Sequence, residues 1–172
     1  MNFKELFELG HSRLFTDQVV QEVITHPERM EELMQLFAQG PVQITQRAAW
    51  CISVIAEKHP EHLHHYYELF IKLLKDKNNH PAVARNIFRA LQFTEIPEKY
   101  QGKILTLAFD YLNDNSQPIA IRAFSMTVIF NLSEKYTDIV PELRASIEAL
   151  LPDASAGLKN RGYKILKRIA KK

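Results

Sequence analysis

The chain has 172 residues, 46% hydrophobic and 24% charged with a net charge of +2, which fits a folded protein with a core and excludes a disordered one. The single cysteine, Cys51, excludes an internal disulfide framework and suits a reducing compartment. The opening "MNFKELFELG" lacks the apolar core of a signal peptide, and no run approaches the roughly 18 apolar residues of a membrane span. We therefore expect a cytoplasmic protein of bacterial type with no transmembrane segment.

Ten helices in five antiparallel pairs are predicted in chain order. The leading pair occupies residues 1–26, with Gly10 ending its first helix and Thr16 or Asp17 capping its second. No segment alternates with period two for long enough to be a strand. The predicted helices are 3–9, 17–25, 28–39, 43–58, 61–76, 81–94, 98–113, 118–135, 139–151 and 157–171.

Four arginines mark an internal repeat of 37–39 residues. Each of them opens a similar phrase, namely "RAAWCISVIA", "RNIFRALQFT", "RAFSMTVIFN" and "RGYKILKRIA". The positions one, five and eight residues after each arginine share one side of a helix, so we expect that side to be buried. A small residue at the first of these positions would let a neighbouring helix approach closely. The arginines are Arg47, Arg85, Arg122 and Arg161.

The second helix of each repeat follows a short turn. Three of these helices have a proline near their start, where proline is tolerated: Pro41, Pro81 and Pro118. Pro-Glu begins the first helix in "THPERMEELMQLF" and "KHPEHLHHYYELF", and "EIPEKYQGKILTL" is similar. The acidic residue is favourable at the positive end of the helix dipole. We expect one domain over residues 1–172, in which the repeats 27–58, 60–96, 97–136 and 137–172 follow the leading pair.

A histidine cluster, His59, His62, His64 and His65, lies in the second of these phrases. His62 and His65 are spaced to share a helix face, but no cysteine, aspartate or second pair accompanies them at a zinc-type spacing. We interpret the cluster as a structural turn at His59 followed by solvated histidines. No metal or other cofactor is expected.

The repeats of this chain resemble HEAT repeats, a family of antiparallel helix pairs. Its members often have an aspartate near the turn and V-R-x-x-A at the start of the second helix. The most similar phrase is "VARNIFRAL" after Asp76, followed by "AIRAFSMTV" after Asp114 and "KNRGYKIL" after Asp153. The first repeat, 27–58, departs from this pattern, with Gly40 and Pro41 in place of the aspartate. The resemblance covers roughly residues 27–172. It implies an all-α fold, a right-handed α-α superhelix with the second helices on its concave side, and a binding role without a specific chemistry.

Basic residues concentrate on the second helices. The windows 46–56, 82–94, 119–133 and 158–172 hold 11 of the 22 basic residues and none of the 20 acidic ones, so we expect a basic second-helix face and acidic first helices. The last helix supplies seven of the 11, including Lys171 and Lys172. It is interpreted as a polar cap of the repeat, with a role at acidic membranes or partners as the alternative.

The candidate binding residues lie on or beside this basic face. Two alternatives accompany them: Arg85, Arg122 and Arg161 are suited to holding the turn aspartates, and Trp50 to burial in the core. Arginine beside aromatic residues suits both anion recognition and protein interfaces. The candidates are Arg47, Trp50, Arg85, Phe88, Arg89, Arg122, Arg161, Lys164, Lys167 and Arg168.

No catalytic motif is found in the sequence: it has no P-loop, no GxGxxG and no serine nucleophile elbow, and Cys51 is expected to be buried. We therefore predict a non-catalytic scaffold whose basic face binds an acidic protein partner. The alternative is nucleic-acid binding, including a relative of the HEAT-like DNA glycosylases for alkylated bases. That alternative is disfavoured because the second-helix windows lack the acidic residue which those enzymes place in their groove.

Overall fold

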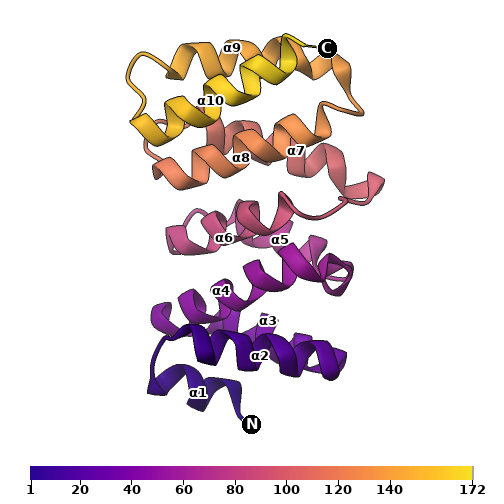
Figure 1. Ribbon diagram of the computed structural model, residues 1–172, viewed down its shortest axis with the longest axis vertical. Helices are drawn as coiled ribbons and strands as arrows, with labels where there is room; N and C mark the ends of the chain where they lie inside the picture. The colour runs from indigo at the N-terminus through magenta and orange to yellow at the C-terminus, as the bar shows by residue number, and fades with distance from the viewer. Residues whose placement is uncertain (172) are drawn as a thin grey trace. The chain divides into compact units, whose positions relative to one another are not determined.

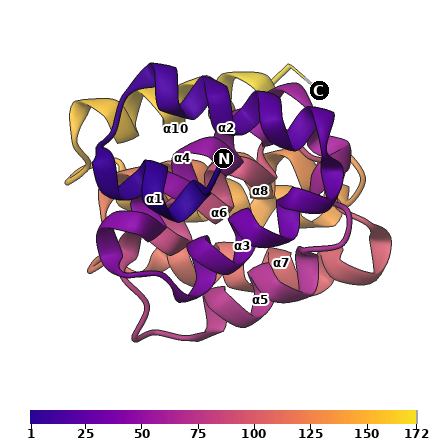
Figure 2. The same ribbon diagram turned by 90° about the horizontal axis from the view of Figure 1, so that it is seen from below.

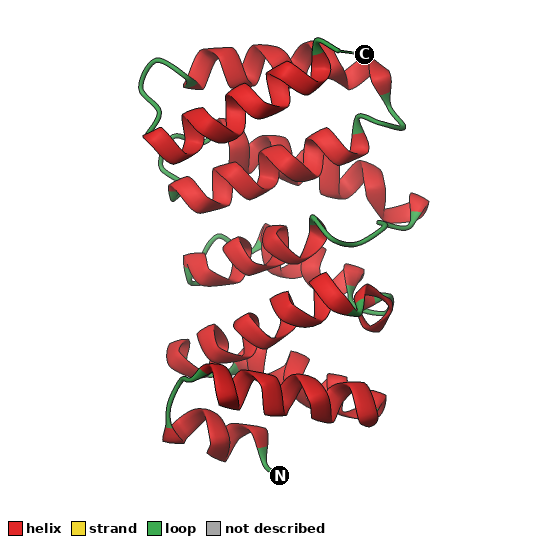
Figure 3. Ribbon diagram, in the orientation of Figure 1, coloured by secondary structure: helices red, strands yellow, loops and turns green. Residues whose placement is uncertain are grey.

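The computed structural model describes residues 1–171, which contain ten α-helices and no β-strand (Figure 3). The predicted all-α fold of ten helices is therefore confirmed. Lys172, the last of the basic residues noted above, lies outside the described residues. The helices are α1 (Phe3–Leu9), α2 (Arg13–Thr25), α3 (Met30–Gln39), α4 (Val42–Lys58), α5 (Tyr67–Lys75), α6 (Pro81–Leu91), α7 (Glu98–Asn113), α8 (Ile119–Leu132), α9 (Val140–Leu150) and α10 (Ala156–Ile169).

Consecutive helices pack as five pairs, α1 with α2 through to α9 with α10 (Figure 1). Three first helices are preceded by a 3₁₀ turn: η1 (Pro27–Arg29), η2 (Pro60–Leu63) and η3 (Thr137–Ile139). Among residues 1–171, no helix combines the length and the apolar composition needed to cross a bilayer.

Two predicted helix starts were wrong. Helix α2 begins at Arg13, and its cap is Ser12, whose hydroxyl accepts a hydrogen bond from the backbone N–H of Phe15 at 3.1 Å. The expected helix 61–76 begins only at Tyr67, because η2 buries Leu63 against α4 and the chain then turns.

The chain forms two compact units, Met1–Ile96 and Pro97–Lys172, and each is described here by itself. The predicted organisation as one domain with four repeats stays a prediction. In the first unit, α4 contacts α1, α2, α3 and α6 (Figure 2). Its buried side includes Ala48, Ala49, Cys51, Ile52 and Ile55. The small side chains among them allow four neighbouring helices to approach one central helix.

A buried polar contact joins α4 to α6 in the first unit. The Ser53 hydroxyl lies 3.2 Å from the amide oxygen of Asn86, and the Asn86 amide nitrogen donates to the carbonyl of Ala82 at 2.8 Å. Both side chains are buried, so their hydrogen bonds offset the cost of removing polar groups from water. Asn86 occupies the position after Arg85, one of the recurring arginines.

Helix α8 has the same central position in the second unit, where it contacts α7, α9 and α10. Gly162 of α10 confirms the expected close approach, because a Cβ atom built there would lie 3.0 Å from the Ile147 side chain and 3.2 Å from that of Leu151. The exposed Gly102 in α7 has no neighbouring atom within 4 Å of such a Cβ. The two glycines therefore differ in packing although both lie inside helices.

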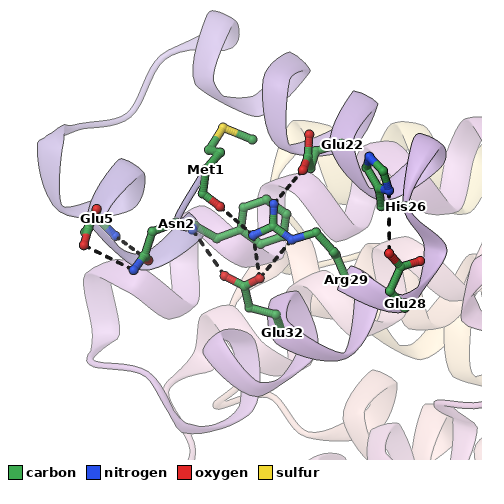
Figure 4. A network of polar contacts seen from close by, with 9 residues as sticks. Met1, Asn2, Glu5, Glu22, His26, Glu28, Arg29 and Glu32 are labelled. Carbon is green, nitrogen blue, oxygen red and sulfur yellow. Dashed lines mark hydrogen bonds and ion pairs between the residues drawn. The ribbon is translucent and has the colours of Figure 1, made fainter.

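Arg29 ties the N-terminal part of the first unit together (Figure 4). Its guanidinium donates to Glu22 of α2 at 2.7 Å, to Glu32 of α3 at 2.6 Å and to the backbone carbonyl of Met1 at 2.6 Å, and it lies 4.0 Å above the Phe3 ring. The hydrogen bond from Arg29 lowers the pKa of Glu22, while the hydrogen bond to Glu32 raises that of Arg29. The sequence analysis did not identify this network, since its acceptors lie on three separate segments.

Matched glycine substitutions test the packing of α10. We expect Gly162→Leu to lower the free energy of unfolding by about 1–3 kcal/mol, because the new side chain overpacks the contact with Ile147 and Leu151. Gly102→Leu has open space and should gain about 0.5–1 kcal/mol from better helix propensity. Urea unfolding followed by circular dichroism measures both, and stabilisation by both variants would contradict the close packing.

Acid should loosen the Arg29 network. Because the folded-state pKa of Glu22 lies below its ordinary value of 4.5, the ion pair stabilises the fold above that value and is lost as the pH falls through the lowered pKa. Amide hydrogen exchange in α1 and α2 should therefore accelerate on acidification below about pH 4.5, after correction for the intrinsic pH dependence of exchange. In Arg29→Met the acceleration of exchange by acid should be smaller, because the ion pair is absent. If the pH dependence of exchange in Arg29→Met equals that of the wild type, the ion pair does not stabilise these helices.

Candidate functional site

The ten candidate residues divide equally between the two units. Arg47, Trp50, Arg85, Phe88 and Arg89 lie in the first unit, on α4 and α6. The other five lie in the second, on α8 and α10: Arg122, Arg161, Lys164, Lys167 and Arg168.

Two of the recurring arginines hold the ends of helices. Arg47 donates to the backbone carbonyl of Phe7 in the last turn of α1, and Arg122 Nε donates to the carbonyl of Leu112 in the last turn of α7 at 2.9 Å. Carbonyls in a last turn lack a helical partner, and a cation at that end is favoured by the helix dipole. These two arginines therefore have a structural role.

The expectation that the arginines hold the turn aspartates was wrong for Arg122, whose acceptor is a carbonyl. The aspartates instead order their own turns. Asp76 accepts from the backbone N–H of Asn78 at 3.0 Å, and Asp114 accepts from that of Ser116 at 2.9 Å. Asp114 also accepts from the Ser116 hydroxyl and the Gln117 amide. In both turns the donor is the backbone N–H two residues after the aspartate.

The other two recurring arginines differ from these and from each other. Arg161 donates to the Thr127 hydroxyl of α8 at 2.7 Å. Arg85 is exposed, and it makes no hydrogen bond or ion pair with the described residues. The repeat in the sequence therefore does not correspond to one repeated contact.

Trp50 forms the centre of an exposed cluster in the first unit. It was a candidate binding residue with burial in the core as the alternative, and that alternative was wrong: 43% of its surface is exposed, because it projects from α4 on the side opposite the buried stripe. The Arg89 guanidinium lies 4.8 Å from the centre of its ring, and the His11 ring meets it edge to face at 6.0 Å. We call Trp50, Arg89 and His11 the tryptophan cluster. The contribution of His11 was missed because it lies in the α1–α2 turn, far from the repeat motif.

Phe88 is removed from the candidate surface. It is 0% exposed, although it has the same offset from its arginine as Trp50. Helix α6 is buried around most of its circumference, so only the line through Arg85, Arg89 and Gln92 is left at the surface. Phe93 was predicted to lie on the buried stripe of this helix, and that prediction was wrong. Helix α6 ends at Leu91, and Phe93 is 41% exposed.

A basic pocket of about 430 Å³ lies in the second unit between α8 and α10. Five cationic side chains line it together with Thr127, Phe130 and Ile165, and no acidic residue does. Arg168 lies 4.3 Å from the centre of the Phe130 ring and 3.8 Å from the Glu134 carboxylate, which does not line the pocket. The cations include all four candidates of α10 and one further lysine: Arg161, Lys164, Lys167, Arg168 and Lys171.

Large apolar side chains are exposed mainly on second helices. Of the eight among the described residues, only Met1 and Leu9 belong to a first helix or its flank. A second-helix face that is both basic and apolar has the composition of a protein interface. The other six are Leu14, Val42, Trp50, Phe93, Ile119 and Tyr163.

The difference in charge between the first and the second helices is smaller than predicted. The helices α4, α6, α8 and α10 carry ten basic residues and one acidic residue, Glu57, so the basic second helices are present in the structure. The first helices α3, α5, α7 and α9 are not strongly acidic, since they carry seven acidic and five basic residues. Eight of the acidic residues lie outside the α-helices, in turns and 3₁₀ segments, where they favour turn formation and helix starts.

The histidine cluster lies at η2 and the turn that follows it. His62 is not solvated as expected, since its side chain is only 14% exposed; His64 and His65 are exposed. His59 lies 3.5 Å from the Glu61 carboxylate, and the His59 and His62 rings meet edge to face. Residues 1–171 contain no group of three or more histidine, cysteine or acidic side chains placed to hold a metal ion.

Paired substitutions should separate structural from surface arginines. Arg122→Met keeps the aliphatic stem but leaves the Leu112 carbonyl without its charged donor, so we expect a loss of about 1–3 kcal/mol in the free energy of unfolding. Arg85→Met should change it by less than about 0.5 kcal/mol, as is usual for exposed sites. Chemical denaturation compares the two variants. Equal losses would refute this assignment of roles.

Comparison with known proteins identifies a family for this chain. Residues 3–169 match a family model described as a HEAT repeat domain, which covers the leading pair α1–α2 as well as the four later pairs. No curated protein and no solved structure gives a significant match.

Proposed function

The chain belongs to the HEAT repeat family, and we propose that it is a non-catalytic scaffold whose basic second-helix face binds an acidic protein partner. HEAT repeats generally mediate protein–protein interactions as scaffolds. What carries the finer proposal is the tryptophan cluster, in which an exposed indole and a guanidinium lie in contact. Tryptophan and arginine are the residues that most often dominate the binding energy of protein interfaces.

The proposed surface has a part in each unit. In the first unit it comprises Trp50, Arg89 and the exposed Arg85, with Phe93 as a further apolar residue. In the second unit it comprises the basic pocket. Arg47 and Arg122 are left out because helix-terminal carbonyls engage them, and Phe88 because it is buried.

A protein partner is favoured over nucleic acid by the composition of this surface. Nucleic-acid binding relies on many unengaged cations that follow a phosphate backbone. On α8 the only basic residue is Arg122, whose guanidinium is bound to a carbonyl of its own unit. The exposed apolar side chains on the same helices instead suit an interface with an apolar centre and a charged rim.

The cytoplasm is the compartment that we propose for this function. Cys51 is buried, and burial raises the pKa of its thiol to about 12, so the thiolate that disulfide exchange requires is scarce. A lone unreactive thiol suits a reducing compartment.

Affinity capture with matched variants tests the proposal. Nuclease-treated lysate of the native organism is passed over the wild type, Trp50→Ala, Arg89→Glu and the triple variant Lys164→Glu/Lys167→Glu/Arg168→Glu. A protein retained by the wild type should be lost with these variants, and its measured Kd should rise about tenfold or more in Trp50→Ala. Lys103→Glu/Arg144→Glu is the control, because it reverses exposed charges on the first helices α7 and α9.

The outcomes distinguish the two classes of partner. Retention of the same protein by all variants would refute the basic face as the binding surface. Tight binding of an oligonucleotide, with a slope of log K against log salt of about −4.5 for about five phosphate contacts, would favour nucleic acid instead. Release of base from alkylated DNA would reveal a glycosylase and overturn the non-catalytic proposal.

A further inference from the structure

The basic pocket of the second unit differs chemically from the tryptophan cluster of the first. Five cationic side chains surround about 430 Å³ between α8 and α10, and one of them, Arg168, pairs with the Glu134 carboxylate at 3.8 Å. One carboxylate cannot neutralise five cations. The pocket therefore favours an anion that brings several negative charges into a small space.

Two guanidinium groups of this pocket are held in place by the protein. Arg161 donates to the Thr127 hydroxyl at 2.7 Å, and Arg168 lies over the Phe130 ring. These contacts reduce the side-chain entropy that would be lost on binding an anion. Held guanidinium groups also suit the bidentate recognition of phosphate.

Three lysines complete the pocket. Lys164, Lys167 and Lys171 are exposed, and they make no hydrogen bond or ion pair with the described residues. Their ammonium groups are long-reaching point charges that can adjust to an entering anion. The pocket thus combines guanidinium donors from Arg161 and Arg168, which contact α8 side chains, with more movable ammonium groups.

We propose that this pocket binds phosphoryl groups carried by a segment of the protein partner, as phosphorylated side chains. This inference rests on the proposed protein-binding function and specifies the chemistry of one part of its surface. A phosphoryl group brings nearly two charges and three strong acceptor oxygens, whereas a carboxylate brings one charge and two oxygens. The volume of about 430 Å³ exceeds that of one phosphoryl group several times, so it accommodates a phosphorylated side chain together with its neighbours.

The cations of this unit are concentrated at α10, which favours a compact anion over an extended nucleic-acid backbone. The neighbouring α8 contributes Thr127 and Phe130 to the pocket, and its one basic residue, Arg122, is bound to the Leu112 carbonyl. A long phosphate backbone would need further cations beyond the pocket, and within this unit α8 does not provide them.

Fluorescence anisotropy of the full chain tests the inference with three labelled peptides of one flexible sequence, carrying two phosphoserines, two glutamates or two serines. The phosphopeptide should bind at least about tenfold more tightly than the glutamate peptide, since charge-assisted hydrogen bonds to phosphate are the stronger set. Inorganic pyrophosphate should compete with it. Equal affinity for the phosphoserine and glutamate peptides would overturn the phosphoryl assignment.

Matched variants locate the site. Lys164→Glu/Lys167→Glu should weaken phosphopeptide binding by about tenfold or more, because it reverses two charges in the pocket. Lys103→Glu/Arg144→Glu makes the same change in charge on α7 and α9 of the same unit, and it should leave affinity within about twofold. Equal weakening by both pairs would reduce the effect to net charge and refute the site.

Two further measurements, partner capture and phosphopeptide binding, distinguish a failure of this inference from a failure of the proposed function. Arg89→Glu in the tryptophan cluster should abolish capture of the protein partner but leave phosphopeptide binding unchanged. Phosphopeptide binding without any captured partner would support the phosphoryl site and reject the scaffold proposal. A captured partner without phosphopeptide binding would reject the phosphoryl site alone. A single-stranded oligonucleotide that binds more tightly than the phosphopeptide, and is lost with Lys164→Glu/Lys167→Glu, would overturn the choice of a protein segment.

Discussion

Burial of one central second helix in each unit is the constraint on which the rest of the structure depends. Helix α4 is enclosed by α1, α2, α3 and α6, and α8 by α7, α9 and α10. A single pair of amphipathic helices leaves an apolar face exposed, so a neighbouring pair must cover it. Small residues such as Ala48, Ala49 and Gly162 permit that approach, and larger side chains between them fill the space. Helix caps, turn aspartates and the Arg29 network fix the connections around this packing.

The same packing decides which parts of a second helix remain available to a partner. On α4 the buried stripe leaves Trp50 outside, whereas on α6 burial extends far enough around the helix to enclose Phe88. The recurring arginines show the same effect. Arg47 and Arg122 reach a helix-terminal carbonyl, while Arg85 meets no acceptor and remains exposed. A repeated sequence position thus becomes structural in one pair and accessible in another.

The two surface features differ in the kind of ligand that they suit. The tryptophan cluster joins apolar area to one guanidinium, which suits the desolvated centre of a protein interface. The basic pocket places five cations around a small volume, which suits concentrated negative charge. A scaffold with both could recognise a protein by its shape and respond to the phosphorylation state of that protein. These roles are complementary because a buried contact stabilises a complex, whereas a phosphoryl contact can be added or removed.

The sequence by itself determined the all-α fold, the ten helices and most of their limits, because apolar residues at helical spacing and prolines at helix starts act locally. It also determined that basic residues gather on the second helices, with Lys164, Lys167 and Arg168 among them. Only the tertiary structure decided the exposure of Trp50, the burial of Phe88, the carbonyl partner of Arg122 and the gathering of α10 cations around Thr127. Each of these depends on how far one helix turns toward its neighbours, or on an acceptor in another helix, and no local pattern of residues encodes either.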